Sequence, residues 1–259
     1  MYTAEISREN PTLILFLFDC SYSMSEKYGD TGLTKGEYLA KIANESLDQL
    51  VLSCEKGDEL RSYFEVGILG YGEGKYELMP IQSILQVAEN PTEMISTEMD
   101  GVKIDRPIWI KDPTRETNTD MKSGFEYASE LLLDWIDGHK SNFPPVLIHV
   151  SDGEWTTGSP VEFVQQMQEN IFTDDGNVVI LNIHISDTSD DKLTFPEIEP
   201  TSSDHQKGLF NMSSVLPDSF LQRAKEIYPA VQPGARGYMF NAQPDDLSKF
   251  FDIGTRLIG

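Results

Sequence analysis

LILFLFDCSYSM, residues 13–24, is the stretch of the sequence that decides the fold. Six large apolar residues follow one another without an intervening polar residue, a pattern typical of a strand buried on both faces of a parallel sheet. The run is far too short to span a bilayer. It stops at Asp19, so we expect this carboxylate to lie where a core strand leaves the sheet.

Two hydroxyls, those of Ser21 and Ser23, follow Asp19 at alternate positions. One carboxylate and two hydroxyls on a tight loop are hard oxygen donors, which suit Mg²⁺ or Mn²⁺ better than Zn²⁺. Aspartate and serine are also common in turns, where they cap backbone N–H groups without a metal. Taken alone, this loop leaves a metal site and a plain turn as open alternatives.

The composition bounds the class of protein. The chain has 259 residues with 39% hydrophobic side chains, enough for a substantial core. A formal net charge of −23 argues against nucleic acid or an anionic membrane as partner. The first residues lack the basic and apolar regions of a signal peptide, and Cys20 and Cys54 are the two cysteines. We therefore expect a cytoplasmic setting.

Apolar runs and helical patterns alternate along the rest of the chain, which predicts an α/β fold of Rossmann-like, doubly wound type. The expected sheet is mostly parallel, has an antiparallel edge strand at 76–84 that contains Pro80, and carries helices on both faces. We predict a single domain over residues 1–259, with its core at about 11–258. Further strands are expected at 63–71, 146–150, 178–185 and 237–240, and helices at 34–54, 119–138, 159–171, 219–228 and from 244 onward. Two segments, 86–117 and 187–216, read as long loops.

The strand at 146–150 ends in Ser151-Asp152-Gly153 and so repeats the arrangement at Asp19. Thr119 opens the helix that precedes this second strand. In open α/β sheets, ligands bind at the carboxyl ends of the strands where the strand order reverses. If the two strands are neighbours at that point, the three loops converge on one crevice, and a metal site is favoured over a turn.

These motifs resemble the metal-ion-dependent adhesion site of the von Willebrand factor A (VWA) family. The sequence DCSYSM at 19–24 is similar to the first motif, NTDM at 118–121 to the threonine motif, and VSDG at 150–153 to the last. The order of the three motifs also matches. Tyr22 stands where many members have glycine, and Thr117 stands near the position of another family glycine; neither change removes a ligand.

The resemblance implies a stand-alone intracellular protein of bacterial type that binds and does not catalyse. Its metal ligands would be Asp19, Ser21, Ser23, Thr119 and Asp152, holding Mg²⁺ or else Mn²⁺ or Ca²⁺. In the family the ion keeps one position open, and a carboxylate of a protein partner fills it. Small intracellular members often accompany ATPases or kinase–phosphatase pairs, so the resemblance implies a companion role of that kind.

A Mg²⁺-dependent phosphatase of haloacid-dehalogenase-like type is the alternative, since such enzymes also place an aspartate after a core strand. They need a second carboxylate two residues later as general acid, and Ser21 cannot do that work at neutral pH. No phosphate-holding lysine is evident in the motifs. Tyr22 and Trp155 flank the expected site as candidate partner contacts, although Trp155 could equally fold back and pack.

Overall fold

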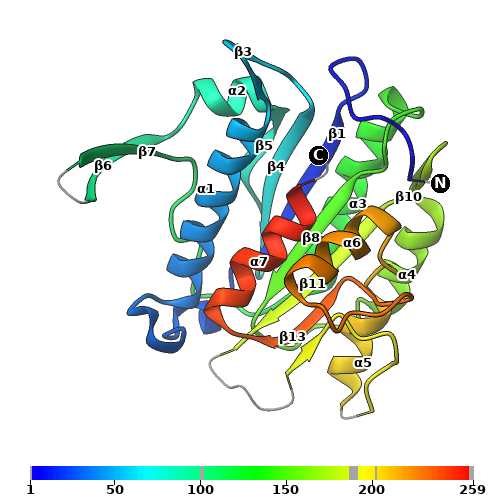
Figure 1. Cartoon of the computed structure of the whole chain (residues 1–259). Coiled ribbons are helices and arrows are strands. Elements are labelled where there is room, and N and C mark those ends of the chain that lie inside the picture. The colour runs from blue at the N-terminus through cyan, green and yellow to red at the C-terminus, as the bar shows by residue number, and fades with distance from the viewer. Residues whose placement is uncertain (1, 100–101, 187–191, 202, 257–259) are drawn as a thin grey trace.

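The structure is a computed structural model that describes residues 2–99, 102–186, 192–201 and 203–256. Its core is a seven-stranded sheet with the order β12-β13-β11-β8-β1-β4-β5 (Figure 1). The strands are β1 (Thr12–Asp19), β4 (Phe64–Tyr71), β5 (Lys75–Ser83), β8 (Val146–Ser151), β11 (Val179–Ile185), β12 (Leu193–Thr194) and β13 (Tyr238–Ala242).

Parallel pairing links the five central strands, whereas β5 runs antiparallel to β4 at one edge and β12 runs antiparallel to β13 at the other. The predicted fold class and the edge strand with Pro80 are confirmed. The second antiparallel edge was not predicted, because β12 is a two-residue strand inside a polar segment.

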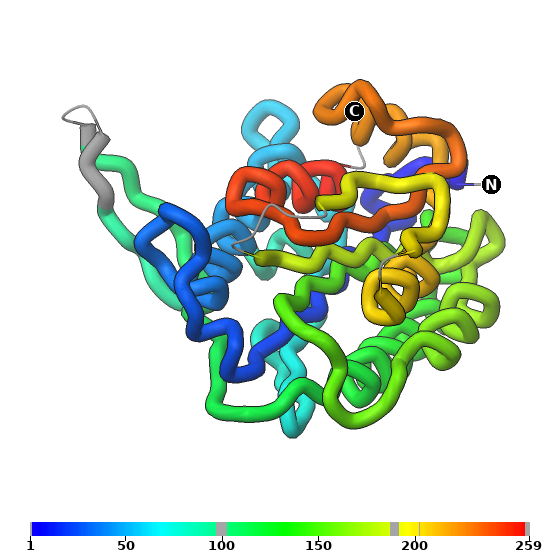
Figure 2. Tube along the Cα trace, turned by 90° about the horizontal axis from the view of Figure 1, so that it is seen from below, coloured from blue at the N-terminus to red at the C-terminus, as the bar shows by residue number. Residues whose placement is uncertain are grey.

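Helices cover both faces of the sheet, as expected for a doubly wound fold (Figures 1 and 2). Every residue of β1 is buried, and its side chains alternate between two apolar cores. Ile14, Phe16 and Phe18 share one core with α1 (Lys35–Ser53), α2 (Ile84–Glu89), α6 (Asp218–Ile227) and α7 (Pro244–Thr255). The other core holds α3 (Met121–Gly138), α4 (Val161–Asn170) and α5 (Asp204–Asn211).

The start of α1 follows the sequence signal. Thr34 is its N-cap and accepts a hydrogen bond from the Glu37 backbone N–H, while the Glu37 carboxylate accepts one from the Thr34 N–H. This reciprocal capping box satisfies two donors that a helix end otherwise leaves free. It fixes where the helix begins, and thereby places Lys35, its first residue, beside the loop that follows β1.

The segment 86–117 is not the long loop that the sequence predicted. It contains the end of α2 and an antiparallel ribbon of β6 (Glu93–Met99) and β7 (Val102–Ile108), which projects from the rest of the molecule (Figure 2). Met94, Ile95 and Ile104 are exposed on it, so the ribbon lacks the half-buried face that makes a strand recognisable. The other predicted loop, 187–216, contains β12 and α5, and its residues 187–191 and 202 lie outside the described residues.

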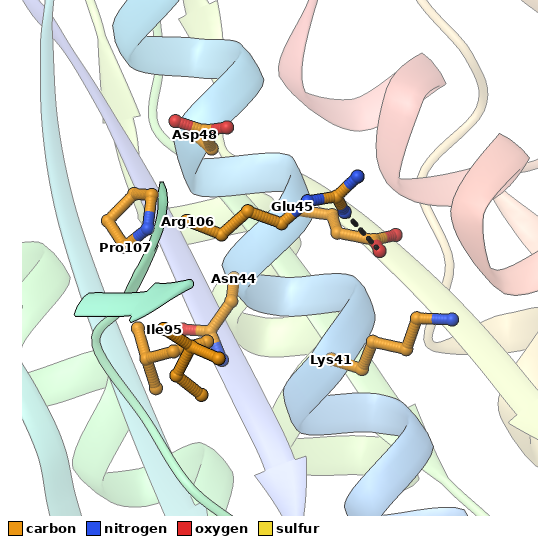
Figure 3. A pocket seen from close by; sticks show the side chains of 8 residues that line it. Lys41, Asn44, Glu45, Asp48, Ile95, Arg106 and Pro107 are labelled. Atoms are coloured by element: carbon orange, nitrogen blue, oxygen red, sulfur yellow. Dashed lines mark hydrogen bonds and ion pairs between the residues drawn. The ribbon is translucent and has the colours of Figure 1, made fainter. Parts of the chain in front are cut away.

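One buried side chain of α1 anchors the segment that follows the ribbon. The Asn44 Oδ1 atom accepts hydrogen bonds from the backbone N–H groups of Trp109 (2.8 Å) and Ile110 (3.2 Å), and its Nδ2 donates to the Ile110 carbonyl (2.9 Å). Figure 3 shows Asn44 beside the hollow of about 250 Å³ between α1 and the ribbon, where Arg106 also pairs with Glu45 at 3.5 Å. An isolated two-stranded ribbon is only marginally stable, so these contacts hold it in place.

Asn44→Ala is expected to lower the free energy of unfolding by about 2–3 kcal/mol, because it leaves buried backbone groups of Trp109 and Ile110 without partners. Urea denaturation followed by circular dichroism measures the effect. Gln49→Ala, at an exposed position of the same helix, is the matched control and should change stability by less than about 0.5 kcal/mol. Equal losses in the two variants would contradict the anchoring role.

Further two-residue strands and short turns complete the structure. They are the pairs β2 (Glu55–Lys56) with β3 (Glu59–Leu60) and β9 (Phe172–Thr173) with β10 (Gly176–Asn177), and the 3₁₀ turns η1 (Tyr22–Ser25) and η2 (Gly29–Thr31). Only η1 bears on the site, because it carries the second serine of the loop after β1.

Candidate metal-binding site

Asp19 and Asp152 lie at the carboxyl ends of two neighbouring strands. Asp19 is the last residue of β1, and Asp152 directly follows β8, which pairs with β1 in parallel register. From β1 the chain proceeds to β4 on one side and later returns to β8 on the other, so the strand order reverses at this point. The convergence expected from the sequence is therefore present, at the place where open α/β sheets bind ligands.

Asp19 is completely buried and is held by donors from three directions. Its Oδ1 accepts the Ser21 backbone N–H at 2.9 Å, and its Oδ2 accepts the Ser151 hydroxyl at 3.0 Å, with the Tyr71 hydroxyl at 3.4 Å. Burial raises the pKa of the Asp19 carboxyl to about 6, and the nearby charge of Asp152 adds to this, against the hydrogen bonds of the serines. A bound cation would relieve this cost of burying the charge.

The two serines connect Asp19 to the second aspartate. The Ser21 and Ser23 hydroxyl oxygens are 3.1 Å apart, and the Ser23 hydroxyl donates to Asp152 Oδ1 at 2.7 Å. The Asp152 side chain has no exposed surface. Two carboxylates and two hydroxyls thus meet in one small volume, and they are four of the five donors predicted from the sequence.

Thr119 reaches the same edge of the sheet through the bonds of its backbone. Its N–H group and carbonyl both bind the Thr156 side chain, at 3.3 and 2.9 Å, and its carbonyl also accepts the Thr156 N–H. A second tie joins the loops of the first two motifs, where the Tyr22 N–H donates to the Thr117 carbonyl at 3.1 Å. Backbone bonds therefore connect all three predicted loops and keep buried Thr119 among them.

Lys35 is a site residue that the sequence analysis missed. Its ammonium group donates to Asp152 Oδ2 at 2.7 Å and to Glu26 Oε2 at 2.8 Å, and only 7% of its side chain is exposed. Burial disfavours the charge of Lys35, but the attraction and hydrogen bonds of Asp152 and Glu26 raise its pKa above the ordinary value. A positive charge therefore lies on the second aspartate at neutral pH. The signal that could have located it is the capping box, which makes Lys35 the first residue of the helix after the serine loop.

A buried hydrogen-bonded chain extends from Asp19 across the sheet. The Tyr71 hydroxyl lies 2.9 Å from His149 Nε2, and His149 Nδ1 lies 2.8 Å from Asn182 Oδ1. Because Asn182 donates its amide to Ser213, its oxygen accepts from His149 Nδ1–H, and the unprotonated Nε2 shares the single Tyr71 hydroxyl proton with the Asp19 carboxylate. Burial lowers the pKa of His149 to about 4, so the ring is neutral at physiological pH. The chain fixes Tyr71 beside Asp19, in the way that outer hydrogen bonds orient metal ligands.

The two aromatic candidates differ in their placement. Tyr22 is 63% exposed beside the serine loop, as a partner contact requires. Trp155 is half-buried and packs on α5, where its ring lies 5.1 Å from that of His205 and closely approaches Gly208. The packing alternative is therefore the observed one for Trp155, and Tyr22 remains the exposed aromatic of the pair.

The residues present fit a hard divalent cation. In residues 2–99, 102–186, 192–201 and 203–256, the structure contains no group of three or more His, Cys, Asp or Glu side chains that could hold a metal. The candidate ligands are instead two carboxylates and three hydroxyls, all oxygen donors of the kind that Mg²⁺, Mn²⁺ and Ca²⁺ take.

Comparison with solved structures shows the class of fold. Proximal thread matrix protein 1 from the mussel byssus is similar with a TM-score of 0.54 and 13% identity over 96% of this chain. A second structure of that protein, with a zinc-occupied MIDAS motif, gives a TM-score of 0.53 at 12% identity. The PilB minor pilin from Streptococcus sanguinis gives 0.53 at 9% identity over 96% of this chain. The chain spans 48% of the length of the mussel protein and 63% of the pilin.

These similarities confirm the predicted architecture, and the chain has a von Willebrand factor A fold. No protein-family model and no curated protein matches the sequence. Among the described helices, none is long and apolar enough to cross a membrane.

Proposed function

We propose that the chain is a non-enzymatic module that binds a protein partner through a divalent cation held by Asp19, Ser21, Ser23, Thr119 and Asp152. One observation carries the proposal. The Ser23 hydroxyl contacts both the Ser21 hydroxyl and the Asp152 carboxylate, at the strand ends where Asp19 is buried. Mg²⁺ fits such oxygen donors, and Mn²⁺ or Ca²⁺ is the substitute. The cation would supply one strong anchor for an Asp or Glu carboxylate of the partner.

The surface around the site supports a protein as the ligand. Tyr22 is exposed at its rim, and tyrosine is among the residues that dominate binding energy at interfaces. The net charge of −23 disfavours nucleic acid and anionic membranes. A cytoplasmic module that accompanies an ATPase or a kinase–phosphatase pair is the setting that we propose for it, on the resemblance of its motifs.

For the phosphatase alternative, the site has one further group that such an enzyme would use, but two features that it needs are missing. Lys35 is a lysine at the site, which the motifs did not reveal. Its ammonium is already bound by two carboxylates, and Asp19 has no exposed surface from which to attack a phosphate ester. Ser21 still stands where such an enzyme needs its general acid. Mg²⁺-dependent turnover of a phosphate ester that is lost in Asp19→Asn would establish the enzyme and overturn the binding module.

Metal-linked stability tests the proposed site directly. A ligand that binds only the folded state stabilises it by about 2.7 kcal/mol at a concentration 100 times its Kd, which corresponds to roughly 5–10 °C for a domain of this size. We expect the melting temperature of the wild type to rise by that amount with Mg²⁺ or Mn²⁺ relative to chelator, and the rise to disappear in Ser21→Ala. Ser141→Ala, at an exposed turn position that precedes β8 and so lies at the opposite end of that strand from Asp152, should retain it. Equal shifts in all three proteins would refute the ligand assignment.

A further inference from the structure

Lys35 places a fixed positive charge inside a site that has two aspartates. The Lys35 Nζ atom lies 2.7 Å from Asp152 Oδ2, while the other carboxylate oxygen, Oδ1, accepts the Ser23 hydroxyl. Its other bond, of 2.8 Å, is to Glu26, whose side chain is 65% exposed. The lysine is thus an internal cation on one of the two carboxylates assigned to the metal.

From this arrangement we infer that Lys35 opposes binding of the divalent metal and, in exchange, strengthens the hold of the loaded site on an anionic ligand. The inference rests on the proposed function and specifies its regulation. With Asp19, Asp152, Glu26 and Lys35 all charged, the four groups sum to −2, and a divalent ion brings the total to 0. Without the lysine the loaded site would keep a net charge of −1. Charges a few ångströms apart in a buried site interact strongly, so this one charge decides whether the loaded site repels a carboxylate.

The contacts show how both cations fit. Because Lys35 is shared between Asp152 and Glu26, its ammonium can remain on Glu26 when a metal takes the Asp152 oxygen. The capping box at Thr34 and Glu37 fixes the backbone of Lys35, so the charge stays beside the site in either arrangement. Metal and carboxylate would then bind with positive coupling, and the coupling would be reciprocal.

Isothermal titration of the full chain with Mg²⁺ and with Mn²⁺, in chloride and in acetate buffers of equal ionic strength, tests the inference. Lys35→Met should bind each metal at least about tenfold more tightly than the wild type in chloride. Acetate is the carboxylate probe, and it should tighten metal binding in the wild type and have a smaller effect in Lys35→Met. Replacing the lysine is thus expected to raise metal affinity in chloride and to reduce the gain in metal affinity that acetate gives. A merely structural role of the lysine would not change these two quantities in opposite directions.

Control variants keep the result interpretable. Lys35→Arg retains the charge and should bind metal as weakly as the wild type. Lys35→Gln is a second neutral variant, which can still donate to Asp152 and replaces Lys35→Met in the comparison if the methionine variant folds poorly. Lys249→Met removes the same charge from an exposed position of α7 and should leave both affinities unchanged. Metal affinities within about twofold across wild type, Lys35→Met and Lys35→Gln would overturn the inference and leave the metal site standing. Absence of metal binding in every variant would instead refute the proposed function.

Discussion

Asp19→Asn is expected to stabilise the metal-free protein at pH 7.5 by about 3 kcal/mol. The pKa of the Asp19 carboxyl rises from 3.8 unfolded to about 6 in the folded chain, chiefly because the group is completely buried. A carboxyl whose folded pKa is raised contributes stability that is present below its unfolded pKa and is lost as the pH rises through the folded one. Stability is therefore lost between about pH 4 and 6, by roughly 1.4 kcal/mol per unit of pKa shift. The neutral amide of Asp19→Asn does not ionise and so avoids this loss.

The surroundings of Asp19 accept an amide. Its Oδ1 can still receive the Ser21 N–H, while the new N–H₂ group can donate to Ser151, whose hydroxyl has the Gly153 carbonyl as a second acceptor. The same change should abolish stabilisation by Mg²⁺, because the amide lacks the charge that attracts the ion. One substitution would therefore raise stability in chelator and remove the response to metal.

Urea denaturation in chelator at pH 4, 5, 6 and 7.5 measures the first effect. The difference between Asp19→Asn and the wild type should grow with pH and level off above pH 6. Asp58→Asn, at an exposed position of the β2–β3 turn, is the matched control and should show no such growth. A variant less stable than the wild type at every pH would contradict the claim that the buried Asp19 charge destabilises the metal-free fold.

The fold was predictable because its central signals are local. An unbroken apolar run that is followed by an aspartate and then by a capped helix indicates a core strand. The run of β1 ends at Asp19, and the helix capped by Thr34 comes after it. Pro80 marked an edge strand for a similarly local reason. The β6–β7 ribbon was missed because its strands pair only with each other and expose their apolar side chains, so no alternation of buried and exposed residues marks them.

The site was predictable only in part, for a related reason. Asp19, Ser21 and Ser23 are neighbours in sequence, and Asp152 repeats their setting at the end of another core strand. The capping box marks Lys35 only as the start of a helix, and the folded path of the chain is what brings its ammonium to Asp152. The chain of bonds from Tyr71 through His149 was equally hidden, because its members lie on different strands and are joined by sheet order alone.

Phe251→Ala should have the largest effect on stability, a loss of about 3–5 kcal/mol, the range for phenylalanine-to-alanine changes in close-packed cores. Phe251 belongs to α7 and is fully buried. Its ring lies 5.2 Å from that of Phe16 and 6.2 Å from that of Phe18, in the central strand that ends at Asp19. Truncation removes the apolar contacts of one ring with two others and leaves a cavity beneath the last helix.

The same variant separates the core from the site. Phe251 packs on the face of β1, whereas the candidate ligands lie at the carboxyl ends of β1 and β8 and on the adjoining loops, so the metal-induced rise in melting temperature should persist on a lower baseline. Lys249→Ala, at an exposed position two residues earlier in α7, is the control and should cost less than about 0.5 kcal/mol. Urea denaturation and melting with and without Mg²⁺ give both readings. A loss below about 1 kcal/mol in Phe251→Ala would mean that α7 does not close this core.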